Sequence, residues 1–213
     1  MSNPIRVPYR SYEEIGNISF SFLKEHGLDQ EIPVDVEAIL EFKLNVGIIP
    51  TPGYQQNHSV EGSLSLDMRT IYVDEHVYRS VETRYRFTLA HELGHIVLHK
   101  SIFRGIRVDS IIDWKGIYKT IDENVYFALE KQAYDFAGLI LVPSHHLKSR
   151  FLRLISESKL KFADAKQRGV TKEKTLDFFK TNAIFRLARI FKVSTDVMEK
   201  RIDKDNLINQ IPW

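Results

Sequence analysis

The sequence RFTLAHELGHIVL, at residues 86–98, sets the organisation of this chain. It places His91 and His95 four residues apart in an almost wholly apolar segment. Residues with this spacing share one face of an α-helix, about 5–6 Å apart at Cβ, so two imidazoles can bind one metal ion. Glu92 directs a carboxylate toward the side of the metal where water would bind. Two core histidines beside an incidental Glu are the alternative, but burying these groups without partners is costly.

The third metal ligand is left open by spacing alone. The chain has no cysteine, so it must be a His or a carboxylate. His99 lies on the same face, but one straight helix cannot readily bring three successive turns onto one tetrahedral ion, which favours a plain helix-end histidine. Glu130 is the better candidate because Ala133, Phe136 and Ala137 follow it in an amphipathic stretch that could pack on the metal helix. Its rivals are Asp109, Asp113, Asp122 and Glu123.

Helical and strand periodicity extend outward from this motif, which we place on a helix over residues 78–100. Before it, the patterns predict helices over 12–25 and 33–42, a strand at Ile48 and Ile49, a polar loop over 51–61, and a hairpin of strands 63–66 and 70–73. After it we expect an irregular segment over 101–124, a helix over 125–141 stopped by Pro143, and a helical tail with a break around 166–171.

These elements predict an α+β fold with two parts. Residues 1–147 form the metal-binding domain, with a small sheet packed on the motif helix, and residues 148–213 form a basic helical subdomain. Residues 148–204 hold 16 Lys and Arg against 7 Asp and Glu, a net charge of +9, whereas the whole chain carries +2. Residues 182–202 fit a helix-turn-helix pattern with its turn at 191–194. Many helix pairs share this pattern, so packing or partner docking is favoured over DNA binding.

No targeting or membrane segment is indicated. Residues 1–10 lack an apolar signal core and contain Pro4 and Pro8. Apolar runs such as residues 137–142 fall far short of the ~18 residues that a membrane span needs. We therefore expect a cytoplasmic protein without a membrane partner.

Several blocks of the chain resemble the ImmA/IrrE metallopeptidases. The first is residues 86–95 with Leu98-His99 close behind, and the second runs from Glu130-x-x-Ala133-x-x-Phe136-Ala137 to Leu141-Val142-Pro143. The hairpin, Pro33-Val34-Asp35 and the C-terminal Leu187-Ala188-x-x-Phe191-x-Val193-Ser194 are also similar. The resemblance implies a gluzincin-like (zincin) core in which Glu130 is the third ligand beside His91 and His95, with Glu92 as the catalytic base.

The resemblance also implies a function: zinc-dependent, site-specific cleavage of a protein, such as a helix-turn-helix repressor, in a stress-response or mobile-element switch. Zn²⁺ is the expected cofactor, with another divalent metal such as Mn²⁺ as the alternative. A competing hypothesis is a DNA-binding or toxin–antitoxin interaction protein with a structural or degenerate metal site. An intact Glu92 favours the peptidase, because a structural zinc site needs no base beside an open coordination position.

The chain departs from the family pattern at two places. The 34 residues between His95 and Glu130 form a longer segment than usual. Tyr134 occupies a position where the family often has Asp or Asn. If that residue supports a ligand, Asp135 or a backbone carbonyl must take its place here, because loss of such support weakens metal binding about 10–100-fold.

Overall fold

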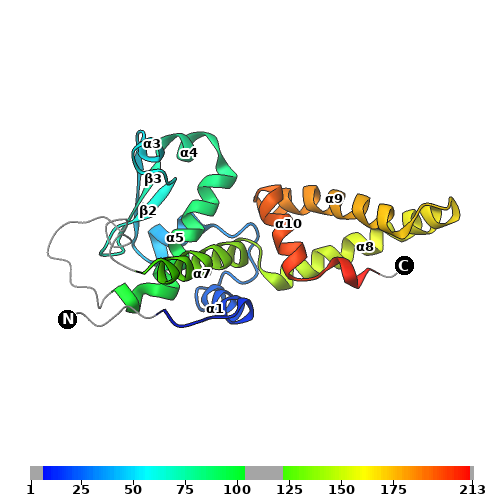
Figure 1. The fold of residues 1–213 in the computed structure, drawn as a ribbon, viewed down its shortest axis with the longest axis horizontal. Helices are drawn as coiled ribbons and strands as arrows, with labels where there is room; N and C mark the ends of the chain where they lie inside the picture. Colours follow the sequence, from blue (N-terminus) through cyan, green and yellow to red (C-terminus); the bar gives the residue numbers. More distant parts are fainter. Residues whose placement is uncertain (1–6, 104–121, 212–213) are drawn as a thin grey trace.

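The helix that carries the His-Glu-x-x-His motif, α5 (Glu82–Phe103), lies at the centre of the larger part of the molecule (Figure 1). The structure is a computed structural model, and it describes residues 7–103 and 122–211. Along α5, Leu89, Ala90 and Leu93 are at most 1% exposed. A helix that is apolar on most of its faces must be covered by other elements. It is covered by α7 (Glu123–Leu141), by the sheet and by the short helices before it.

The sheet has three strands, β1 (Gly47–Thr51), β2 (Gly62–Leu64) and β3 (Thr70–Asp74), in the order β1-β3-β2. β2 and β3 pair antiparallel, which confirms the predicted hairpin, and β1 runs parallel to β3. Ile71 and Val73 alternate with exposed Tyr72, so one face of β3 is buried in the core. The sheet is small, and the fold is a mostly helical α+β structure. This confirms the predicted α+β class with a small sheet.

The predicted single helix over 78–100 is wrong, because two helices occupy this region. α4 (Glu75–Ser80) begins directly after β3, where the Asp74 side chain caps it by accepting from the backbone of His76 and Val77. Val81 then leaves the helical conformation, with φ −134° and ψ 77°, and α5 starts at Glu82. The break lets α4 lie against β1 and β3 while α5 runs on toward α7.

Two other predictions need smaller corrections. The helix predicted over 33–42 begins only at Val36, where Asp35 caps it, and consists of α2 (Val36–Ala38) and a π-helix (Ile39–Lys43). The predicted loop over 51–61 contains a short helix, α3 (Tyr54–His58), which is flanked by left-handed Gly53 and Ser59. The irregular segment predicted over 101–124 falls largely outside the described residues. Its two ends are helical, because α5 extends to Phe103 and α7 begins at Glu123.

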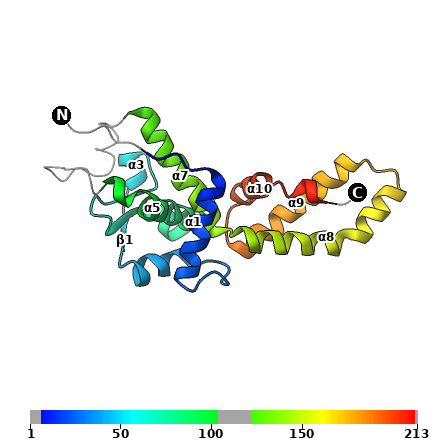
Figure 2. The ribbon, with the colours of Figure 1, turned by 90° about the horizontal axis from the view of Figure 1, so that it is seen from below.

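The remaining helices match their predictions closely. α1 (Tyr12–Glu25) has a full capping box between Ser11 and Glu14, and it packs on α7. Pro143 ends α7 as expected. Helices α8 (Ser144–Gln167), α9 (Lys172–Phe191) and α10 (Thr195–Lys204) follow, with a 3₁₀ turn (Ile208–Gln210) after them. Together they extend away from the sheet (Figures 1 and 2).

Buried Arg201 on α10 connects this extension to the rest of the chain. Its guanidinium donates to the Val142 carbonyl at 3.1 and 3.3 Å and pairs with Asp205 at 2.8 Å. Among the described residues, no helix is both long and apolar enough to span a membrane.

Candidate metal centre

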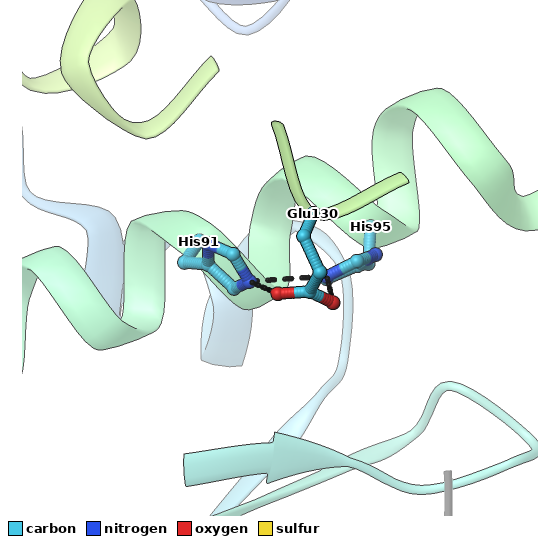
Figure 3. Close-up of side chains that lie close together, drawn as sticks. All are labelled: His91, His95 and Glu130. Atoms are coloured by element: carbon cyan, nitrogen blue, oxygen red, sulfur yellow. Dashed lines mark hydrogen bonds and ion pairs between the residues drawn. The ribbon is translucent and has the colours of Figure 1, made fainter. Parts of the chain in front are cut away.

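Three side chains from two helices converge at the centre of the larger part (Figure 3). His91 and His95 lie one turn apart on α5, and their Nε2 atoms are 3.1 Å from each other. Glu130 on α7 reaches between them, with Oε2 3.1 Å from His91 Nε2 and Oε1 3.4 Å from His95 Nε2. One ligand atom from each residue lies within 4.8 Å of the others, so the three could hold one divalent metal ion.

A close helix contact makes this convergence geometrically feasible. Gly94 on α5 faces Ala133 on α7, and a Cβ at Gly94 would lie only 3.0 Å from both Cα and O of Ala133. The backbones therefore approach more closely than two larger side chains would allow. Gly94 adjoins His95, and Ala133 lies three residues beyond Glu130, so this contact sets how far Glu130 lies from the two histidines.

The electrostatics of the three groups fit a cation site. Burial alone would raise the pKa of Glu130, but hydrogen bonds and charge from His91 and His95 hold it well below its usual value. Burial alone would lower the pKa of His91, whereas the bond to Glu130 and the charge of Glu92 raise it overall. The carboxylate is thus ionised and directed at two ring nitrogens.

Glu92 lies beside this cluster, with 5% of its surface exposed. Its Oε2 has no hydrogen-bond partner within residues 7–103 and 122–211. Burial raises the pKa of Glu92, while the neighbouring histidines partly offset this effect. An unsatisfied buried oxygen next to three potential ligands fits a site where a metal and its water would supply the missing partner.

A cleft with a volume of about 230 Å³ opens over these residues. It brings together residues from β2 and the segment before it, from α5 and from α7. They are Val60, Glu61, Gly62, Ser63, Phe87, Thr88, His91, Glu92, His95, Tyr126 and Glu130. A substrate in this cleft would lie against both the cluster and the β2 edge.

The structure separates Glu130 from two of its rivals. Asp122 and Glu123 are exposed at the start of α7, where Asp122 caps the helix by accepting from Asn124 N–H at 2.8 Å. Asp109 and Asp113 fall outside the described residues. His99 is not part of the cluster, and it is not a plain helix-end histidine either, because it is fully buried. Its Nδ1 lies 3.1 Å from His95 Nδ1.

Tyr134 and Asp135 do not contact the cluster through any described hydrogen bond. The Tyr134 hydroxyl accepts from Lys200 at 2.9 Å, and Asp135 pairs with Lys131 and Lys204.

Sequence reasoning missed the contact that His99 makes with His95. On its other side, His99 Nε2 lies 3.2 Å from Gln132 Oε1. Burial lowers the pKa of His99 to about 3, so its ring is neutral near pH 7. The i, i+4 spacing of His95 and His99 was the available signal.

In a mostly helical α+β fold, two imidazoles and a carboxylate beside a buried glutamate have the chemistry of a metallohydrolase centre, the class to which metallopeptidases belong. Residues 41–203 match the model of peptidase family M78, described as the IrrE N-terminal-like domain, and the chain therefore belongs to this family. Membership implies a metallopeptidase that acts on a protein substrate. No curated protein matches the chain.

Proposed function

We propose that this protein is a zinc-dependent endopeptidase in which His91, His95 and Glu130 bind the metal and Glu92 is the general base. The observation that carries the proposal is the convergence of the three ligand atoms beside Glu92 Oε2 in one cleft. The donor set suits Zn²⁺, and Mn²⁺ is the alternative metal. In this proposal residues 1–147 form a zincin-like core.

The chemistry assigns a separate task to Glu92. Zinc, when bound, polarises a carbonyl and lowers the pKa of its water from about 15.7 to about 7. Glu92 then removes a proton through Oε2, and its raised pKa helps it hold that proton until the leaving amine needs it.

The β2 strand offers a surface for an extended peptide. Glu61 O accepts from Asp74 N–H and Ser65 N–H donates to Thr70 O, so the backbone groups of odd-numbered residues face β3. Those of even-numbered residues face the opposite edge, and Gly62 on this strand lines the cleft. A peptide could therefore add to β2 through Gly62 and present its scissile carbonyl to the metal.

We further propose that the substrate is a helix-turn-helix transcription repressor, cleaved at one site in a stress-response or mobile-element switch. The support is the resemblance to ImmA/IrrE metallopeptidases and the family membership. Residues 148–213, a helix-turn-helix-like subdomain in this proposal, would dock the substrate. A repressor substrate also places the reaction in the cytoplasm.

The competing function is DNA binding by this basic subdomain, with a degenerate metal site. Several of its cations are already paired with acids, including Arg153 and Arg186 with Glu157, and Arg168 with Asp164. Paired cations contribute less to phosphate binding, which favours protein docking. A nanomolar, sequence-selective DNA complex at physiological salt would favour the competing function.

The proposal is tested with purified protein, zinc, and the repressor encoded beside its gene. Wild type should bind one zinc per chain and cut the repressor at one bond. His91→Ala, His95→Ala and Glu130→Ala should lose zinc and activity, whereas Glu92→Gln should keep zinc and lose activity. Asp122→Ala and Glu123→Ala are the matched acidic controls and should change neither. A fully active Glu92→Gln or Glu130→Ala variant would contradict the assignment.

A further inference from the structure

A chain of buried hydrogen bonds leads from His95 to the N-terminal segment of the protein. His95, His99 and Gln132 are 1%, 0% and 5% exposed. His95 Nδ1 lies 3.1 Å from His99 Nδ1, and His99 Nε2 lies 3.2 Å from Gln132 Oε1. The Gln132 side chain then meets the Pro8 carbonyl and the Arg10 guanidinium, each at 2.9 Å.

The far end of this chain fixes the orientation of the Gln132 amide. A backbone carbonyl can only accept a hydrogen bond, so the NH₂ group of Gln132 must face Pro8. A guanidinium can only donate, so the amide oxygen must face Arg10. The two contacts agree with each other, and both leave Oε1 as the atom that His99 meets.

This orientation decides where each imidazole carries its proton. Because Gln132 Oε1 accepts, His99 Nε2 must donate. His99 is fully buried and shares that amide oxygen with the Arg10 guanidinium, so a second cation is disfavoured there and the Nδ1 of His99 is bare. That bare Nδ1 can only accept, so His95 must donate from its own Nδ1.

In a neutral His95 the remaining lone pair is then on Nε2, the atom that lies 3.1 Å from His91 Nε2 and 3.4 Å from Glu130 Oε1. Without a metal ion the Glu130 carboxylate draws a proton to this Nε2, so His99 and Glu130 compete for the single proton of His95.

We propose that His99, Gln132, Arg10 and the Pro8 carbonyl form a positioning relay that holds His95 in the tautomer whose Nε2 can bind the metal. The relay rests on the proposed metal-binding role of His95 and goes beyond it. Pro8 and Arg10 lie outside residues 41–203, so family membership does not carry this inference. The N-terminal segment, which leads into α1, thereby becomes part of the metal centre.

Zinc affinity tests the relay by competition with a chromophoric chelator. His99→Leu removes the acceptor at similar volume and should weaken zinc binding about 10–100-fold, the usual effect of losing a ligand's supporting partner. His99→Asn puts an amide oxygen near the position of Nδ1 and should recover most of the affinity. Gln132→Leu removes the acceptor that holds the His99 Nε2–H and should also weaken zinc binding. Ser19→Ala, a buried polar change on α1, is the control and should bind as wild type.

Nitrogen NMR of the ring tautomers provides a readout that general damage to the fold would not produce. In metal-free wild type, His95 should be protonated at Nδ1 and His99 at Nε2. In Gln132→Leu, His99 should shift toward a mixture of tautomers. Wild-type His95 protonated at Nε2, or unchanged zinc affinity in folded Gln132→Leu, would overturn the relay. If His99→Leu fails to fold, the wild-type tautomers and the zinc affinity of Gln132→Leu still test the relay. Failure of wild type to bind zinc would contradict the proposed function and not the relay, because the tautomers are measured without metal.

Discussion

Replacing Gly94 with alanine should separate the proposed metal ligands, His91 and His95 on α5 and Glu130 on α7, without changing any of them. The added methyl would lie 3.0 Å from Cα and O of Ala133 and 3.3 Å from Cβ of Phe136. Comfortable contacts between carbon atoms are about 3.5–4.0 Å, so α5 and α7 must move apart by roughly 0.5 Å. All three neighbours are backbone atoms of α7 or the first atom of a side chain on it, and none of them can rotate away.

The expected change in stability is the balance of two opposing effects. Overpacking a well-filled contact costs about 1–3 kcal/mol. Replacing glycine by alanine inside a helix contributes about 1 kcal/mol in the opposite direction. Gly94→Ala should therefore lower the free energy of unfolding by about 0–2 kcal/mol. Gly16→Ala on α1 is the matched control, because its new methyl meets only the Leu139 side chain at 3.6 Å, an ordinary contact. That variant should be up to about 1 kcal/mol more stable than wild type.

Zinc affinity should respond more strongly than stability. A metal centre tolerates ligand displacements of only about 0.2 Å, so a shift of Glu130 by roughly 0.5 Å should weaken zinc binding at least about 10-fold. Chelator competition measures the affinity, and urea unfolding measures the stability. Gly16→Ala should bind zinc as wild type does. The reasoning is refuted if Gly94→Ala binds zinc with wild-type affinity and gains as much stability as Gly16→Ala.

Three further predictions concern pH, the C-terminal helices and the metal. The Asp74 carboxylate accepts hydrogen bonds from the backbone N–H groups of Gln55, His76 and Val77, and these bonds lower its pKa in the folded state. Asp74→Ala should therefore lower the free energy of unfolding by about 1–3 kcal/mol at pH 7. This stabilisation is present above the unfolded pKa of about 3.9 and disappears as pH falls through the lower folded value, so urea titrations of variant and wild type should converge below about pH 4, and a constant gap would disprove the assignment. Arg201→Met should cost about 2–4 kcal/mol because Asp205 and the Val142 carbonyl lose their partner, and chemical unfolding with an unchanged midpoint would contradict this role. Free zinc at about 1,000 times its Kd should add about 4 kcal/mol to wild-type stability, so a chelator should lower the thermal midpoint of wild type but leave that of Glu130→Ala unchanged.

Local sequence signals predicted the elements that depend on near neighbours. The predicted and observed bounds of α1 coincide at residues 12 and 25, because a capping box marks its start and apolar spacing marks its buried face. Pro143 ends α7, and the hairpin forms where two short apolar runs flank a turn. The spacing of His91 and His95 likewise requires only that residues 86–98 be helical.

The boundary between α4 and α5 depended on more distant contacts. Helical periodicity runs through Val81 without interruption, but the packing of α4 on β1 and β3 requires a change of direction there. Periodicity reports which face of a helix is apolar, and it does not report where two successive helices meet different neighbours. The sequence therefore could not place this break.

The sequence by itself determined the pair of histidines and the glutamate beside them, because helix geometry places residues four apart on one face. Tertiary structure decided which carboxylate meets the histidines, because residue spacing left five acidic candidates. The contact of Gly94 with Ala133 brings Glu130 to the histidines, whereas Asp122 and Glu123 stay exposed. Tertiary structure also joined Gln132 to Pro8, 124 positions earlier in the chain. A hydrogen bond between distant segments depends on which helix faces lie together, and no local pattern of residues encodes that pairing.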